Sequence, residues 1–143
     1  EMGVFGSKHF INKQKEEKKD KVYPSIVAYF NLDMVGRLEG KPLTVHGTGS
    51  SATWSDLVDS VSGDLELKKS DNPYLPTDST PIYNAGVPIL ALFTGLHDDY
   101  HTPRDTIDKI DYTGLEKVSK YLRDLTTATA NLESAPDYIK VKR

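Results

Sequence analysis

A dense group of polar side chains follows one of the two strongly apolar segments of the chain. Residues 98–106 read Asp-Asp-Tyr-His-Thr-Pro-Arg-Asp-Thr, which supplies an imidazole, a phenol and three carboxylates. Imidazole and carboxylate groups bind metal ions, and a phenol can donate a hydrogen bond to a developing oxyanion. Open α/β sheets place their ligands where strands give way to loops, so this segment is the first candidate site. The hypothesis depends on His101, because a lone histidine in a loop is otherwise a solvated or structural residue.

Asp33 is the second candidate, and it lies near the end of the other apolar segment, residues 25–35. An ionised carboxylate in an apolar strand is costly to bury unless it is paired or bound to metal. The alternative is an aspartate that forms a turn where the strand ends. If the two strands are adjacent and parallel, their carboxyl ends meet at one edge of the sheet. Asp33 and His101 would then lie close together.

Several other polar residues near these segments have two interpretations each. Asp105 can act as the outer partner that orients a metal-binding histidine, or it can cap the following turn. Tyr100 can stabilise an oxyanion or simply pack. Asp78 and Ser79 belong either to a substrate loop or to an ordinary turn, and His97 is a rival metal ligand.

The elements that would position these residues alternate between helices and strands. Apolar and β-branched segments predict strands at residues 25–35, 42–47, 65–68 and 87–93. Helical spacing and capping signals predict helices at residues 7–15, 52–61, 80–86 and 112–132. For the third helix we expect Thr80 as the N-cap and Pro81 at the first helical position, and we expect the tail after Pro136 to be loose. The start of segment 25–35 is almost continuously apolar, which suggests a strand buried on both faces and favours a parallel or mixed sheet. The alternation of strands and helices indicates an α/β layer fold.

The composition excludes several classes of function. The chain has 143 residues, the size of one domain. It has no cysteine, so a metal would have to be held by His, Asp or Glu. A net charge of −3 gives no electrostatic footprint for nucleic acid. No run of about 18 apolar residues predicts a membrane span, and neither a serine-nucleophile elbow nor a complete dinucleotide-binding fingerprint is present.

Three segments, taken in order, resemble the M28 family of zinc aminopeptidases. They are residues 1–10 (EMGVFGSKHF), residues 31–36 (NLDMVG) and residues 100–106 (YHTPRDT). The resemblance covers nearly the whole chain, and three ordered motifs are far more specific than any one alone. Residues 78–81 (DSTP) also match an active-site loop, which often reads Ser-Asp-His in relatives and differs here.

The resemblance implies a three-layer α/β fold with a mixed, mostly parallel central sheet flanked by helices. This chain would hold the C-terminal part of that peptidase domain in residues 1–135, followed by a tail in residues 136–143. The family's two zinc ions are held by five ligands: a His, a bridging Asp, a Glu, a second Asp and a second His. The other ligands and the general base, a glutamate, would lie upstream of this chain.

Carried over residue by residue, the resemblance assigns Glu1, Asp33 and His101 as the Glu, second Asp and second His ligands. Tyr100 matches a tyrosine that polarises the scissile carbonyl in some members. The resemblance of residues 78–81 would place Asp78 and Ser79 in the substrate loop. Asp105, from its position four residues after His101, would lie outside the ligand shell.

The implied activity is zinc-dependent hydrolysis of N-terminal peptide bonds by the complete parent protein. Its partners would be peptide substrates and the missing N-terminal half of the same domain, and the family favours an exported location. This chain alone is expected to be inactive. Two alternatives remain open: a non-catalytic peptidase-like binding domain, and a single-zinc enzyme that resembles glutaminyl cyclases.

Overall fold

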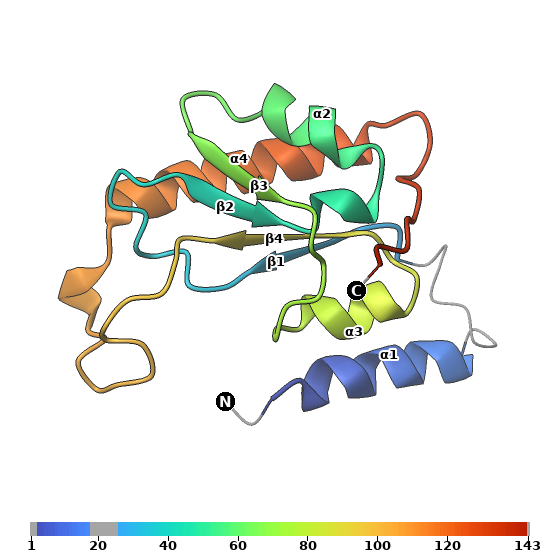
Figure 1. Cartoon of the computed structure of the whole chain (residues 1–143), viewed down its shortest axis with the longest axis horizontal. Coiled ribbons are helices and arrows are strands. Elements are labelled where there is room, and N and C mark those ends of the chain that lie inside the picture. The colour runs from blue at the N-terminus through green and yellow to red at the C-terminus, as the bar shows by residue number, and fades with distance from the viewer. Residues whose placement is uncertain (1–2, 18–25, 143) are drawn as a thin grey trace.

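The fold is built from helices and strands arranged in α/β layers (Figure 1). The computed structural model describes residues 3–17 and 26–142. The strands are β1 (Tyr29–Leu32), β2 (Leu43–His46), β3 (Leu67–Ser70) and β4 (Ile89–Phe93). The helices are α1 (Phe5–Glu17), α2 (Trp54–Ser60), α3 (Ser79–Asn84) and α4 (Tyr112–Ala130), with short 3₁₀ turns η1 (Thr48–Ser50) and η2 (Ile107–Lys109).

The described strands form one sheet in the order β1-β4-β2-β3. β1 is parallel to β4 and β3 is parallel to β2, whereas β2 and β4 run antiparallel. The predicted mixed, mostly parallel sheet is therefore confirmed. The pairing of Leu32 with Leu92 brings the carboxyl ends of β1 and β4 to the same edge, as the sequence argument about Asp33 and His101 requires.

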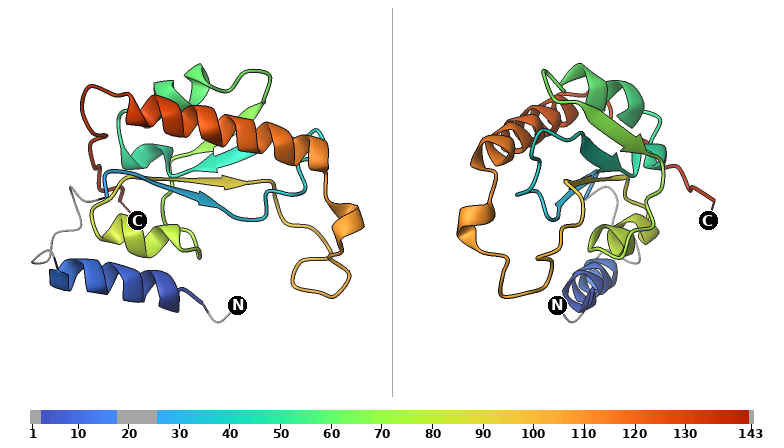
Figure 2. Two further views of the ribbon diagram at one scale, coloured as in Figure 1. Left: turned by 180° about the vertical axis from the view of Figure 1, so that it is seen from behind. Right: turned by 60° about the vertical axis from the view of Figure 1, so that its left-hand side comes forward.

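Helices cover both faces of the sheet (Figures 1 and 2). On one face α2 and α4 pack against the sheet, and the buried residues there are Trp54, Val58, Val118, Tyr121, Leu125, Leu43, Val45, Leu90 and Leu92. On the other face the buried residues are Ile82 and Tyr83 of α3, Ile11 of α1, and Val87 and Ile89. Successive side chains of a strand point to opposite faces. The continuous apolar run of β4 is thus explained by burial on both sides.

The start of α3 differs from the sequence prediction. The helix begins at Ser79 with Asp78 in the N-cap position, so the assignment of Thr80 as the N-cap is wrong. The Thr80 hydroxyl donates instead to the carbonyl oxygen of Leu75 in the preceding loop. Pro81 is the third helical residue, so its predicted place at the first position is wrong as well. It still lies in the first turn, where backbone N–H groups have no partner within the helix and a missing one costs little.

The C-terminal tail is anchored, contrary to the expectation of a loose segment. The Asp137 carboxylate accepts a hydrogen bond from the Ser51 hydroxyl at 2.6 Å. Further along, the backbone N–H of Val141 donates to the Tyr83 hydroxyl at 2.7 Å, and that hydroxyl donates to the carbonyl of Ile139 at 2.9 Å. These partners are far away in the sequence, so local composition alone could not reveal them.

Within residues 3–17 and 26–142, no helix has both the length and the apolar character needed to cross a membrane.

Candidate metal centre

The carboxyl ends of β1 and β4 open into one cavity of about 500 Å³, which Asp33, Tyr100 and His101 all line. Asp33 directly follows β1, and its backbone N–H donates to the carbonyl of Leu92 at 3.3 Å. His101 lies in the loop that leaves β4. Parallel pairing of the two strands therefore brings a carboxylate and an imidazole, 68 residues apart in the chain, to the same cavity.

The backbone is in an uncommon conformation at both sides of this cavity. Met34, directly after Asp33, has a φ of 53°, and His101 has a φ of 55°. A left-handed conformation costs a non-glycine residue about 1–3 kcal/mol, and such residues cluster at functional sites. Met34 is held in place because the backbone N–H and the hydroxyl of Thr94 both donate to its carbonyl oxygen. These turns end the strand at Asp33 and redirect the loop at His101.

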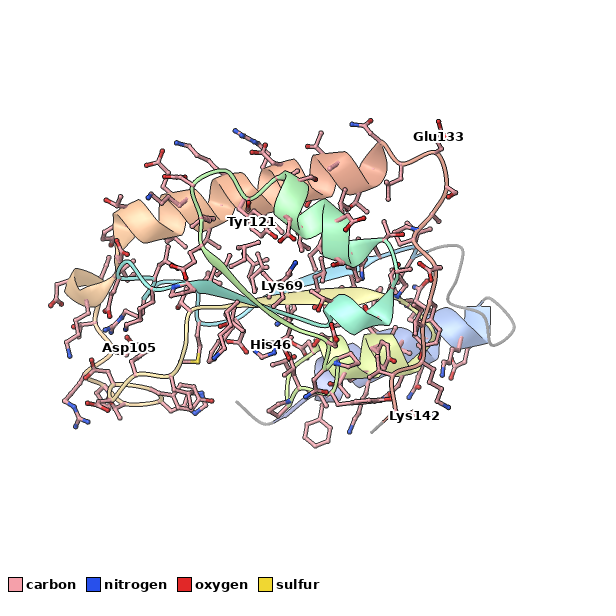
Figure 3. The ribbon with its side chains drawn as sticks, turned by 45° about the horizontal axis from the view of Figure 1, so that its top comes forward. His46, Lys69, Asp105, Tyr121, Glu133 and Lys142 are labelled. Carbon is pink, nitrogen blue, oxygen red and sulfur yellow. The ribbon has the colours of Figure 1, made fainter. Side chains whose placement is uncertain are left out.

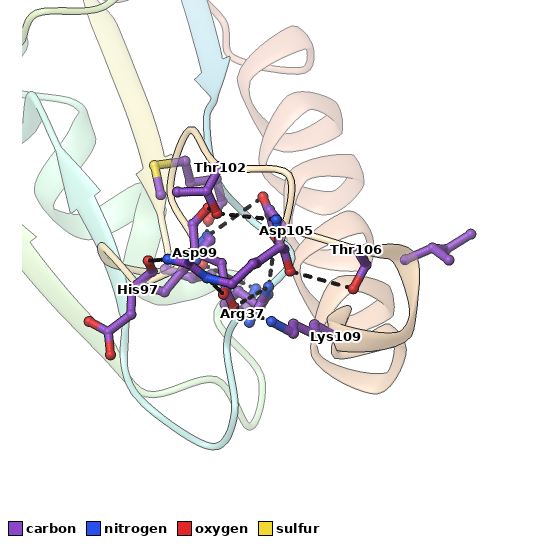
Figure 4. Close-up of polar contacts among 12 residues, drawn as sticks. Arg37, His97, Asp99, Thr102, Asp105, Thr106 and Lys109 are labelled. Atoms are coloured by element: carbon purple, nitrogen blue, oxygen red, sulfur yellow. Dashed lines mark hydrogen bonds and ion pairs between the residues drawn. The ribbon is translucent and has the colours of Figure 1, made fainter.

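An arginine joins the segment after β1 to the loop after β4 (Figure 4). The guanidinium of Arg37 donates to Asp105 at 2.6 Å and lies 3.6 Å from Asp99. Asp99 in turn pairs with Lys109 at 2.8 Å, and that hydrogen bond is the largest cause that lowers the pKa of Asp99. The Arg37 side chain is only 12% exposed, so solvent screens it less than a surface ion pair. We call Arg37, Asp99, Asp105 and Lys109 the loop clamp.

The position of Asp105 differs from both of its predicted roles. Its carboxylate lines the cavity but contacts Arg37, and its other oxygen lies 4.0 Å from Nε2 of His97. The capping alternative is wrong, because the following turn, η2, has Thr106 in its N-cap position with no side-chain cap. The next helix, α4, is capped by Asp111, which accepts a hydrogen bond from the backbone N–H of Gly114 at 2.9 Å. In the described structure Asp105 thus supports the loop through the arginine.

Tyr100 and His101 present their rings together at the cavity. Their ring centroids are 3.8 Å apart and the ring planes are 20° from parallel, so the phenol stacks on the imidazole. The turn that carries them is closed by the N–H of Tyr100, which donates to the carbonyl of His97, and by Thr102, which donates to the carbonyl of Asp99. Tyr100 is 43% exposed and remains accessible to a ligand.

The remaining candidates have different surroundings. Glu1 lies outside the described residues. Asp78 lines a small cavity of about 110 Å³ together with Asp33 and the N-terminal residues Gly3 and Val4. Ser79 is fully buried, and its hydroxyl lies 2.7 Å from that of Thr77, which fits a structural residue of α3.

His97, the rival ligand, also lines the larger cavity. Its Nδ1 is buried and has no hydrogen-bond partner among the described residues. Because Nδ1 is enclosed, only Nε2, which lies 4.0 Å from Asp105, could reach a metal ion, and His97 stays an alternative ligand.

The donor chemistry of the cavity suits zinc, which accepts carboxylate oxygen and imidazole nitrogen as ligands. Asp33 and His101 supply one of each. In the parts of the chain that the structure describes, no three His, Cys, Asp or Glu side chains lie close enough together to hold a metal ion. A complete site would therefore need donors in addition to these two.

A second, largely apolar pocket of about 270 Å³ adjoins the first and shares Asp33, Met34 and Tyr100 with it. Its walls come partly from residues 75–77 and from Leu96. The polar cavity and the apolar pocket together could bind a molecule that has a reactive polar group and an apolar side chain.

Comparisons with known proteins agree with this arrangement. The crystal structure of the Legionella pneumophila aminopeptidase LapA superposes with a TM-score of 0.73 at 16% identity, and covers 92% of this chain and 37% of that chain. The zinc aminopeptidase BSAP of Bacillus subtilis gives 0.70 at 22% identity, with 96% and 36% covered. An aminopeptidase from Aneurinibacillus sp. strain AM-1 gives 0.68 at 23% identity, with 96% and 32% covered.

This chain thus spans a little over a third, or less, of the length of those solved aminopeptidases. No curated protein sequence matches it. The sequence model of Peptidase family M28 matches residues 1–126, which is most of the chain. The chain therefore belongs to peptidase family M28.

Proposed function

We propose that this chain is part of a zinc-dependent aminopeptidase, which removes residues from the N-termini of peptides. One observation supports the proposal above the others: Asp33 and His101 line a single cavity at the carboxyl ends of two parallel strands. The family and the fold of the solved neighbours support a peptidase. The dependence on zinc and the number of two zinc ions per complete site are part of the proposal.

In this proposal Asp33 and His101 hold zinc together with donors such as Glu1 and residues outside this chain. Bound zinc would polarise the scissile carbonyl and make a water molecule acidic enough to attack it near neutral pH. Tyr100, stacked on the imidazole, would donate its phenolic hydrogen bond to the substrate's carbonyl oxygen. The loop clamp would hold the histidine loop at a fixed distance from Asp33.

The test replaces the two proposed ligands in the full-length protein. Asp33→Ala and His101→Ala should each reduce both bound zinc and hydrolysis of a leucine anilide. We expect a loss of at least about 100-fold, because replacing even an outer partner of a metal ligand costs about 10- to 100-fold. The matched controls are Asp56→Ala and His9→Ala, which remove exposed side chains of the same types from α2 and α1.

Zinc content and activity close to wild type in the Asp33 and His101 variants would contradict the proposal. Product analysis separates the related activities. Release of a free amino acid identifies an aminopeptidase, cyclisation of glutaminyl peptides identifies a cyclase, and tight zinc binding without turnover of either substrate identifies a binding domain.

A further inference from the structure

The apolar pocket beside the metal centre has polar residues where it meets the sheet. Its walls include Met34, Leu75, Phe93 and Leu96, while Asn31, Ala91 and His46 lie at the sheet. The strand register pairs Asn31 with Ala91 and Ala91 with His46, so these three residues form a row across β1, β4 and β2. Ala91, the small residue in the middle, leaves space between an amide on one side and an imidazole on the other.

The row faces the side of the sheet that carries α3. On β2, Leu43 and Val45 belong to the core under α2 and α4. Side chains alternate along a strand, so His46 points to the opposite face, where it lines the pocket. Figure 3 shows His46 over the sheet, well separated from Asp105 in the loop beyond the sheet's end. The imidazole packs near Phe93, with ring centroids 6.3 Å apart.

His46 brings a hydrogen-bonding ring to the wall of this pocket, beside Phe93. Its Nδ1 is buried and has no partner among residues 3–17 and 26–142. Burial, and to a smaller extent the charge of Lys68, lowers the pKa of His46. A neutral imidazole has one nitrogen that donates and one that accepts. Because Nδ1 is enclosed, Nε2 is the nitrogen that can meet a ligand.

We propose that this pocket takes the side chain of the substrate's N-terminal residue and that His46 selects an aromatic side chain ending in a hydroxyl, namely tyrosine. The proposal rests on the proposed aminopeptidase function. A phenol both donates and accepts, so it matches either tautomer of the imidazole. The apolar walls disfavour a charged side chain, and the positive charge of Lys68, which acts on His46, disfavours lysine and arginine in particular.

The size of the pocket agrees with this occupant. A volume of about 270 Å³ corresponds to roughly nine water molecules at about 30 Å³ each. That space admits an aromatic ring with its hydroxyl group. The pocket also opens toward Asp33 and Tyr100, which line both cavities. A substrate whose side chain is bound here would therefore keep its scissile carbonyl near the metal centre.

The experiment compares anilides of tyrosine, phenylalanine, leucine and lysine with the full-length protein. We expect kcat/KM for tyrosine to exceed that for phenylalanine about 3- to 10-fold, the factor that one neutral hydrogen bond provides. Lysine should be the poorest substrate. His46→Leu should abolish the difference between tyrosine and phenylalanine. His46→Gln, which keeps a hydrogen-bonding group, should retain part of the preference.

The matched control is Thr44→Val, which alters the same strand on the same face, where Thr44 pairs with Phe93. It should leave the ratio of tyrosine to phenylalanine unchanged. A wild-type protein that prefers phenylalanine, or a ratio that His46→Leu leaves unaltered, would overturn the inference.

Calorimetry with free L-tyrosine and L-phenylalanine separates this inference from the proposed function. If no anilide is hydrolysed, the aminopeptidase assignment fails. Tighter binding of tyrosine by the wild type than by His46→Leu still supports selection of a hydroxyl group by His46. Equal binding of the two amino acids by the wild type overturns that selection.

Discussion

At the scale of single residues, Arg37 connects the two sides of the candidate metal centre. Its guanidinium bridges Asp105 and Asp99 across 68 and 62 positions of sequence. In the full-length protein, Arg37→Met keeps most of the apolar stem but frees the histidine loop. We expect zinc affinity, measured by competition with a chelating dye, to fall about 10- to 100-fold, as for other partners outside a ligand shell. Arg37→Lys should recover only part of it, because an ammonium cannot make planar paired contacts.

The control for Arg37 is Arg123→Met, an exposed arginine of α4 that pairs with its neighbour Asp124. It should leave zinc affinity unchanged. Loss of thermal stability in Arg37→Met without any change of zinc affinity would show that the arginine supports the fold alone, and the positioning role would be wrong.

The sequence could identify Asp33 and His101 because each follows an apolar strand, where side chains of this chemistry are unusual. It could not identify Arg37, which has no local signal that distinguishes it from any surface arginine. For the same reason the sequence predicts Asp105 only as a cap or a partner of the histidine. Its actual partner comes from a segment that only the folded chain brings near.

At the scale of elements, one carboxylate supports both the start of α4 and the turn before β2. Asp111 accepts hydrogen bonds from the backbone N–H of Gly114 at 2.9 Å and of Glu39 at 2.8 Å. Asp111→Ala should lower the free energy of unfolding by about 1 kcal/mol at pH 7, which is typical for an N-cap. Denaturant unfolding measures the difference, with Asp56→Ala as the control.

The effect of Asp111 should depend on pH in a defined direction. The hydrogen bond from Gly114, and then that from Glu39, lower the pKa of Asp111 in the folded state. Stability from a depressed carboxyl pKa is fully present above the unfolded value of about 3.9 and is lost as the pH falls through the folded value. The wild type and Asp111→Ala should therefore converge in stability below about pH 4. A difference that stays constant down to pH 3 would contradict this.

The helices and strands are largely predictable from the sequence, because the periodicity of hydrophobic residues and the residues that form turns are local signals. Every described strand falls within or beside a predicted apolar segment, and α4 follows its helical spacing closely. The errors arose where contacts outside the predicted element decide the outcome. Thr80 bonds to the preceding loop and so does not cap α3, and the tail is held by Ser51 and Tyr83.

At the scale of the whole molecule, this chain is shorter than the solved structures whose fold it shares. It spans 32–37% of the solved aminopeptidases that share its fold. Of the described residues that line the main cavity, the proposal assigns two, Asp33 and His101, as zinc ligands, short of the three or four protein ligands of a zinc site. A polypeptide of residues 1–143 should therefore bind zinc more weakly than the full-length protein.

The central claim is that Asp33 and His101 hold the same metal centre. Anomalous diffraction at the zinc edge from crystals of the full-length protein tests it most directly. We predict zinc peaks at about 2.0–2.2 Å from a carboxylate oxygen of Asp33 and from an imidazole nitrogen of His101. Zinc bound elsewhere in the protein, with both of these side chains free of metal, would contradict the account.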